Sequence, residues 1–414
     1  MNRKLRQRDL VVLASSASLA LFLGACGGGS DDSSNSPSTS GTSSSSSAAS
    51  GKPYVIAEIS DLSGPVGVFD TPPYDGMKAY FDYLNSTGGV NGRPITTKAS
   101  DAKGDVQTTL ASFTQYSGQS DVIAITGLGL DTQMDPLLPK LASTGIAAIS
   151  SPSSTTSGLP YNKWYFSFGE DYGGDVTATA QYLSEKDSSA KIGYVAFDSP
   201  ATRSVASNLT KAVAGTGVSV VGKEFLPPTA TDASQAISSL VHAGATWIAI
   251  GAATDPQFTS ILQNAKVQNF DGNILAIAGG GEDSNFKLAS TDKYKALRSF
   301  HSPSETNLPG VAKMVSEVDG AKPDKYYYSM GWALGEVIAK ALTTCGSDCT
   351  RAGFRDALET TSFSDPYGLA ASAIGFSDTC HQGFRSTFVY GWDGSKPVQE
   401  GSIDAYNKPP CGGS

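Results

Sequence analysis

The feature that most constrains the fold is a repeated alternation of short apolar runs with segments of helical periodicity. Runs at 54–59, 122–126 and 146–150 open a first series, and runs at 191–197, 218–225, 246–251 and 273–278 form a second. Short β-branched runs between helices are typical of parallel strands that are covered on both faces. The sequence therefore predicts an α/β protein with two doubly wound parallel-sheet lobes.

The pattern changes after residue 300. A helix is expected over 326–342, followed by strands over 371–377 and 386–394. These late elements are too few for a third domain, so they should complete the first two, and the chain should cross between the lobes more than once at a hinge. The predicted limits are 54–167 and 301–374 for lobe 1, and 168–300 and 375–414 for lobe 2.

The N-terminal region predicts export and tethering. Residues 1–25 have a basic start and a short apolar stretch, as in a signal peptide. The letters Leu-Gly-Ala-Cys at 23–26 resemble a bacterial lipobox, in which Cys26 receives a lipid; the alternative is ordinary cleavage near Ala25. The rest of residues 26–52 is rich in Gly and Ser and has too few apolar residues to form a core, so a flexible linker is expected there. We expect a lipid anchor on the outer face of the cytoplasmic membrane, or on the periplasmic side.

Composition excludes several partners. The net charge is −9 and no run of basic residues occurs, so no nucleic-acid partner is expected. No second apolar run approaches membrane-spanning length, so membrane contact is expected through the lipid anchor only. The four cysteines besides Cys26 predict two disulfides; three connectivities are possible, and we favour Cys345–Cys349 and Cys380–Cys411. No metal site or cofactor is expected, since only His381 lies near these cysteines.

Ligands of open α/β sheets bind at the carboxyl ends of the strands. Six loops fall there and are rich in Gly, Ser and Thr: 60–70, 126–133, 150–158, 197–204, 251–257 and 278–284. Their N–H and hydroxyl groups suit a carboxylate or another small anion, although they equally suit helix capping.

Three acids in these loops are candidates to receive a ligand ammonium: Asp131, Asp255 and Glu282. The alternatives are helix caps for the two aspartates and a solvated charge for the glutamate. Phe69 and the aromatic run 164–166 are candidates for an apolar wall, although the run also suits the core of a hinge.

One block of the sequence carries a family resemblance. The letters GGVNGRPI at 88–95, with the Ser/Thr-rich block after the strand 146–150, resemble the leucine/isoleucine/valine-binding proteins, which belong to the periplasmic-binding-protein class of ABC importers. The resemblance extends from residue 54 to about 392. It implies a Venus-flytrap architecture with three crossovers between the lobes.

The resemblance also implies site residues. Leu130, Asp131 and the run Ser153, Ser154, Thr155 would hold the ligand α-carboxylate, and Phe69 would supply an aromatic wall. Glu282 falls closest to the acid that meets the ammonium, although a shift of one residue would place Gly281 there instead. Aromatic residues of the second lobe in the family fall here at Thr202 and Asp255, and Asp131 replaces a usual Ser. A carboxylate beside a carboxylate site is unfavourable, so the scaffold is better supported than the ligand.

The implied function is an extracytoplasmic solute-binding component of an ABC importer. It would bind a small amino acid, of branched-chain type, and deliver it to a membrane permease. The alternatives are an amide, urea or aromatic acid as ligand, and a sensor module that closes on its ligand without transport. An enzyme is not expected, because none of the three histidines lies in the loops and neither a Gly-x-Ser-x-Gly elbow nor a P-loop occurs.

Overall fold

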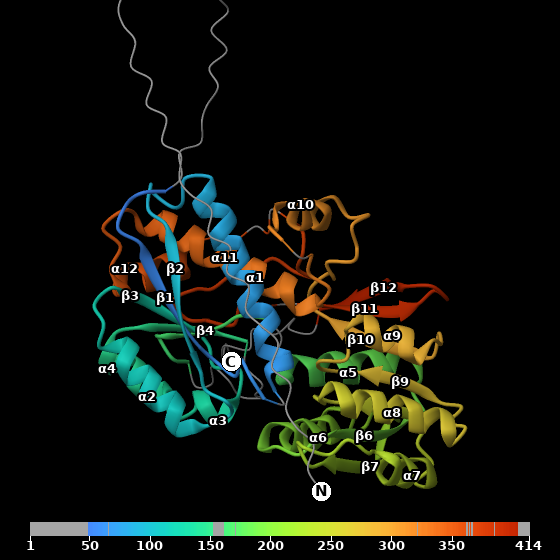
Figure 1. The fold of residues 1–414 in the computed structure, drawn as a ribbon. Helices are drawn as coiled ribbons and strands as arrows, with labels where there is room; N and C mark the ends of the chain where they lie inside the picture. Colours follow the sequence, from blue (N-terminus) through green and yellow to red (C-terminus); the bar gives the residue numbers. More distant parts are fainter. Residues whose placement is uncertain are drawn as a thin grey trace, which may run out of the picture. The chain divides into compact units, whose positions relative to one another are not determined.

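Two sheets organise the part of the chain described by the computed structural model, which comprises residues 49–404 apart from 65, 152–160, 170, 321, 362, 364, 366 and 385 (Figure 1). The first sheet has five parallel strands in the order β2-β1-β3-β4-β5. Their bounds are β1 Tyr54–Ser60, β2 Ile95–Asp101, β3 Val122–Gly127, β4 Ala147–Ser150 and β5 Tyr165–Ser167.

The second sheet has seven strands in the order β12-β11-β10-β9-β8-β6-β7. Five of them are parallel, and β11 and β12 form an antiparallel extension at one edge. The bounds are β6 Lys191–Phe197, β7 Ser219–Leu226, β8 Trp247–Ile250, β9 Asn273–Ala276, β10 Tyr294–Arg298, β11 Thr387–Trp392 and β12 Pro397–Ile403. The predicted fold class, two doubly wound parallel-sheet lobes, is confirmed.

The helices alternate with the strands as the sequence pattern predicts. Those that follow strands of the first sheet are α1 Gly67–Ser86, α2 Val106–Ser117, α3 Asp131–Met134 and α4 Leu138–Thr144. Those associated with the second are α5 Tyr172–Lys186, α6 Pro200–Ala212, α7 Ser234–His242, α8 Asp255–Val267 and α9 Asp283–Ala289. The late helices are α10 Pro309–Glu317, α11 Tyr326–Cys345 and α12 Arg351–Thr360.

Apolar residues on both faces of the strands explain why helices cover both faces of each sheet. In β1, Tyr54 and Ile56 belong to one core cluster, whereas Val55, Ala57 and Ile59 belong to another on the opposite face. Because successive side chains of a strand point to opposite faces, a continuous apolar run must be covered by helices twice.

The chain passes between the two sheets three times. It leaves the first sheet after β5, returns after β10 to form α10, α11 and α12, and enters the second sheet again at β11. The crossing segments are paired: Ser167 bridges to Gln382, and Phe300 bridges to Ala370. Helix α11 packs along α1 of the first lobe (Figure 1). The residue limits of the two lobes remain a prediction.

Three local details matter for the loops. Helix α1 begins at Gly67, so the last four residues of the predicted loop 60–70 are helical. Helices α3 and α4 are separate, because Pro136 has no N–H group to continue the first. The expected strand at 371–377 is absent; only isolated bridges at Ile374 and Ser377 form there.

Two features concern covalent links and membranes. The predicted disulfide Cys345–Cys349 is present at the end of α11. Cys26 and Cys411 lie outside the described residues. The lipid anchor and the Cys380–Cys411 bridge therefore remain predictions. Among the described residues, no helix combines the length and the hydropathy needed to cross a bilayer.

Candidate functional site

A cavity of about 110 Å³ lies where the carboxyl ends of strands from both sheets meet helix α11. Each of the six predicted loops contributes to it. Its lining includes Ser60, Asp61, Gly127, Gly129, Leu130, Ser150 and Ser151 from loops of the first sheet, Phe197, Ala252, Ala278 and Gly279 from loops of the second, and Tyr327, Met330, Gly331 and Leu334 from α11. This is the place where open α/β sheets bind ligands.

The first-sheet side of the cavity carries three carboxyl groups, Glu58, Asp61 and Asp70. Glu58 is near the end of β1 and accepts hydrogen bonds from the hydroxyls of Ser60 and Thr126. Asp61 Oδ1 accepts from the Gly104 N–H at 2.5 Å and from the Gln133 amide at 2.9 Å. Asp70, in the first turn of α1, accepts from the Asp61 N–H at 3.0 Å.

Burial shifts the titration of this cluster. It raises the pKa of Glu58, and it raises the pKa of Asp70 to about 7, with the adjacent charges of Asp61 and Glu58 acting in the same direction. Asp61 is fully buried, and its Oδ2 atom has no hydrogen-bond partner among the described residues. A buried carboxylate oxygen without a partner is costly, so a donor from a bound molecule would be favourable there.

The second-sheet side is mainly apolar. Phe197, Ala252 and Ala278 form a small cluster against which Phe69 packs, and the Phe69 ring meets Tyr327 edge to face at 6.3 Å. Gly279 has a φ of +71°, and a Cβ placed there would lie 2.7 Å from Phe69 Cε1. Glycine therefore permits the close approach of the second lobe to the aromatic wall of the first.

Two of the predicted site residues line this cavity, Phe69 and Leu130. Asp131 and Asp255 do not. Asp131 begins α3, and its Oδ1 accepts from the Thr132 N–H at 2.8 Å. Asp255 begins α8, is mostly exposed, and lies 3.9 Å from the ammonium of Lys325. Both aspartates lie in the first turn of a helix, where a negative charge is favourable, but the N-cap positions belong to Leu130 and Thr254, so the alternative interpretation of the aspartates as caps is wrong.

Thr202 is not among the lining residues of the cavity, and its hydroxyl is already engaged. It is fully buried, and its hydroxyl donates to the Phe197 carbonyl at 2.6 Å. Its N–H donates to the Ser199 hydroxyl at 3.1 Å, which completes a capping box at the start of α6. Ser153, Ser154 and Thr155 lie outside the described residues, so their role remains a prediction.

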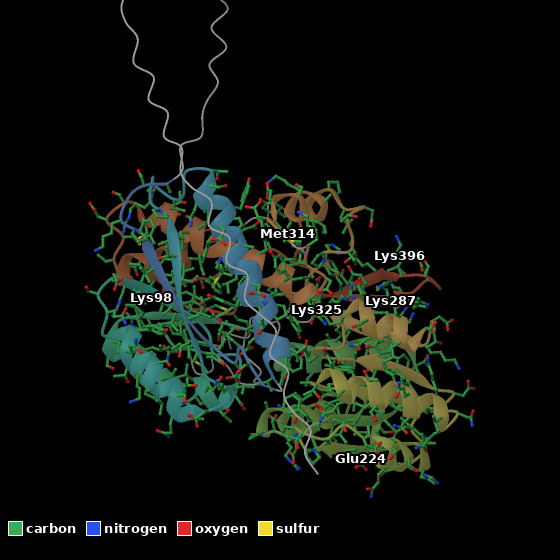
Figure 2. The ribbon with its side chains drawn as sticks, in the orientation of Figure 1. Lys98, Glu224, Lys287, Met314, Lys325 and Lys396 are labelled. Carbon is green, nitrogen blue, oxygen red and sulfur yellow. A yellow bond between two sulfur atoms is a disulfide. The ribbon has the colours of Figure 1, made fainter. Side chains whose placement is uncertain are left out.

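Glu282 also differs from expectation. It is buried and turned to the hinge, where its Oε2 accepts from the Tyr326 N–H at 3.3 Å at the start of α11. Burial raises its pKa to about 7, although the cations Lys325 and Arg298 act in the opposite direction. Lys325 immediately precedes α11 (Figure 2). The side chain predicted to bind an ammonium therefore anchors the hinge helix.

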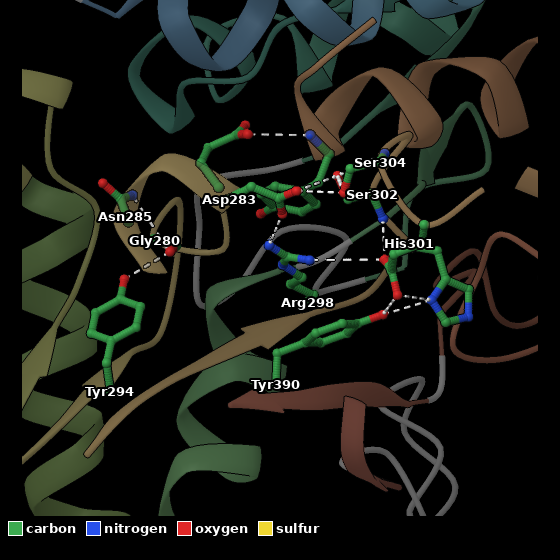
Figure 3. A network of polar contacts seen from close by, with 12 residues as sticks. Gly280, Asp283, Asn285, Tyr294, Arg298, His301, Ser302, Ser304 and Tyr390 are labelled. Atoms are coloured by element: carbon green, nitrogen blue, oxygen red, sulfur yellow. Dashed lines mark hydrogen bonds and ion pairs between the residues drawn. The ribbon is translucent and has the colours of Figure 1, made fainter. Parts of the chain in front are cut away.

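Arg298, whose charge acts on Glu282, is the centre of a polar network (Figure 3). The fully buried Arg298 guanidinium donates to Asp283 at 2.6 Å and lies 4.4 Å from the centre of the Tyr390 ring. His301 Nδ1 and the Tyr390 hydroxyl are 2.6 Å apart. These groups join β10 to the crossing segments, so the network stabilises the hinge rather than the cavity.

Sequence reasoning missed the carboxyl groups that do line the cavity. Glu58 is the single charged residue within the apolar run 54–59, and a lone charge in a buried strand is a usable signal. Asp61 and Asp70 lie within the first predicted loop but were not singled out there. Asp175, which lines the second-sheet side, lies in the first turn of α5. Among the described residues, no group of His, Cys, Asp and Glu side chains is arranged to hold a metal ion.

Two α/β lobes that enclose a small cavity define the class of two-lobed binding proteins. A family model described as periplasmic binding protein matches residues 53–397. The chain therefore belongs to the periplasmic binding protein family, and it is a binding protein, not an enzyme. A comparison with curated protein sequences gave no significant match.

Three solved structures share the fold and are distant in sequence. An ABC transporter substrate-binding protein from Aeropyrum pernix is 19% identical with a TM-score of 0.77, over 87% of this chain and 98% of that one. A branched-chain amino acid ABC transporter protein from Thermus thermophilus with bound valine is 17% identical with a TM-score of 0.74, over 84% and 95%. A fatty acid ABC transporter substrate-binding protein from Thermomonospora curvata is 20% identical with a TM-score of 0.72, over 86% and 95%.

Proposed function

We propose that this chain is the extracytoplasmic solute-binding component of an ABC importer, tethered by a lipid on Cys26. One observation carries the proposal: both lobes and the hinge helix α11 contribute to a single cavity at the carboxyl ends of the strands. A solute bound there would bridge the lobes. Three structurally similar proteins are parts of ABC transporters, which is consistent with this role.

The proposed mechanism is closure on the solute. A ligand that contacts both lobes binds the closed form better than the open one, and it shifts the population by that difference in affinity. The contact between Phe69 and Gly279 supports a closed arrangement, since α1 and the loop after β9 meet beside the cavity. The closed form would then dock on a membrane permease and release the solute to it.

The size of the cavity limits the solute. A water molecule needs roughly 10–15 Å³ of such a volume, so 110 Å³ holds on the order of ten non-hydrogen atoms. A branched-chain amino acid is of this size, and the walls are apolar, as its side chain requires. The bound ligands of structural neighbours range from valine to 4-hydroxybenzoate, so the family likeness leaves the solute class open.

Thermal unfolding of the full chain with a solute panel tests the proposal. The panel contains branched-chain, aromatic and polar amino acids, amides, urea, aromatic acids and aliphatic amines. A solute at 100 times its Kd stabilises the folded form by about 2.7 kcal/mol, so we expect a rise of several degrees for one class. The proposal would be overturned if no member of the panel raised the unfolding temperature.

A further inference from the structure

The charge of the cavity lining has one sign. Glu58, Asp61 and Asp70 lie on the first-sheet side and Asp175 on the second, and no Lys, Arg or His is among the described lining residues. The segment 152–160, which is outside the described residues, contains none of these three residue types in its sequence. Among the described lining residues there is therefore no cationic side chain to neutralise an anionic ligand.

Asp70 is the acidic group that a ligand can contact most directly. Gly129 lies next to Asp70, where a Cβ would come within 2.7 Å of Asp70 Oδ1. The absence of a side chain at 129 leaves that oxygen free to face the cavity. Asp61 contributes a second attraction, because its buried Oδ2 has no hydrogen-bond partner among the described residues.

The remainder of the lining is mainly apolar, with the hydroxyl groups of Ser60, Ser150 and Ser151 as its main polar side chains on the first-sheet side. Phe69, Phe197, Tyr327, Met330 and Leu334 enclose most of the space, whose volume of about 110 Å³ admits only a small molecule. Desolvated apolar walls strengthen the electrostatic contribution of the carboxyl groups, since the local dielectric constant is below that of water.

We propose that the solute is a small amine: an apolar body with one positively charged nitrogen at the first-sheet end of the cavity, and no carboxylate. The ammonium is held by Asp70 and Asp61, with Glu58 behind them, while the body lies between Phe69, Tyr327 and Met330. This inference rests on the proposed function, because it names the solute class of the same site. It reverses the expectation from the family resemblance, in which the first lobe holds a carboxylate.

A matched set of compounds tests the inference by calorimetric titration of the full chain. Leucine, 3-methylbutylamine and 4-methylpentanoate share one apolar body and differ in the charged groups that they carry; phenylalanine and 2-phenylethylamine form a second pair. We expect at least one amine to bind at least tenfold more tightly than its parent amino acid, and 4-methylpentanoate to bind most weakly.

The outcomes separate this inference from the proposed function. If an amino acid or 4-methylpentanoate binds more tightly than the matched amine, or if only an anionic or neutral solute of the wider panel binds, the amine inference is overturned and the receptor function stands. If no solute of any class binds, both are overturned.

Two variants on helix α1 form a matched comparison. Asp70→Asn retains an acceptor for the Asp61 N–H but removes the charge, and we expect the Kd of the amine to rise at least tenfold. Asp82→Asn removes an exposed charge on the same helix, paired with Lys78, and should change the Kd less than twofold. An unchanged Kd in Asp70→Asn would overturn the assignment of the ammonium site. If that variant fails to fold, Asp61→Asn provides the same test at the second carboxyl group of the ammonium site.

Discussion

Two carboxyl groups, Asp70 at the cavity and Glu282 in the hinge, have similarly raised pKa values and different surroundings. Burial raises the pKa of both Asp70 and Glu282 to about 7. Asp70 faces the cavity among other acids, whereas Glu282 faces the N-terminus of α11 and the cations Lys325 and Arg298. A shifted pKa therefore marks burial in both places, and only the partners of each group distinguish a binding site from a hinge.

The comparison extends to the rest of each side. The first-sheet side supplies most of the charge of the cavity, while the second supplies small and aromatic residues that cover it. The second lobe contributes one carboxyl group to the lining, Asp175, whereas Asp283 and Arg298 are paired with each other in the hinge. We infer that the first lobe selects the solute mainly by charge, and the second lobe selects it mainly by shape when the cleft closes.

The largest loss of solute affinity is expected from disrupting the contact between Gly279 of the second lobe and Phe69 of the first. Gly279→Ala places a Cβ 2.7 Å from Phe69 Cε1 in a backbone with a φ of +71°, so it opposes closure. We expect solute affinity to fall about 30-fold, which corresponds to about 2 kcal/mol. Calorimetric titration measures it. Gly244→Ala is the control: its φ is +78° and nothing lies within 4 Å of the added atom, so it should leave affinity unchanged. Equal affinities for the two variants would contradict closure at this contact.

A smaller change in solute affinity is expected when the pH is lowered. Asp70 has a pKa of about 7, and the groups that face it, Glu58 and Asp61, are also acids, so lowering the pH below about 7 removes negative charge from the cavity. An aliphatic amine stays protonated throughout this range. We expect its affinity to fall about tenfold from about pH 8 to about pH 6, and Asp70→Asn to flatten that profile. An affinity that rises as the pH falls would indicate a bound carboxylate instead.

Much of the fold was predictable, because apolar runs such as 54–59 and 191–197 determine strands that must be covered twice. Local polar effects were harder to anticipate. The helix break at Pro136 depends on one missing N–H group, and the start of α1 at Gly67 precedes the residues with clear helical periodicity. The expected strand at 371–377 lies in a crossing segment, where pairing partners come from distant parts of the chain.

The site was predicted as a location more reliably than as a set of residues. Each of the six loops reaches the cavity, because strand ends of one sheet share an edge. The direction of a side chain within a loop is not encoded by its position: Thr202 turns inward to cap α6, and Glu282 turns to α11. Alignment with a family places a residue in a loop, and the packing of neighbouring elements then decides what it contacts.

The smallest effect on binding is expected from Glu282→Gln. The amide keeps an acceptor for the Tyr326 N–H, and the side chain does not line the cavity, so solute affinity should change less than twofold. Stability should respond instead. Because the folded-state pKa of about 7 exceeds the usual value of 4.5, the wild type takes up a proton on folding, and its free energy of unfolding declines as the pH rises from 4.5 to 7.

The variant lacks this proton uptake, so relative to the wild type it should gain up to about 3 kcal/mol across that range, as measured by urea unfolding at several pH values. Glu185→Gln, at an exposed position on α5, is the control and should follow the wild-type profile. A loss of affinity in Glu282→Gln as large as that in Asp70→Asn would mean that both sides of the cleft contribute charge to the solute, and the division between a selecting lobe and a closing lobe would fail.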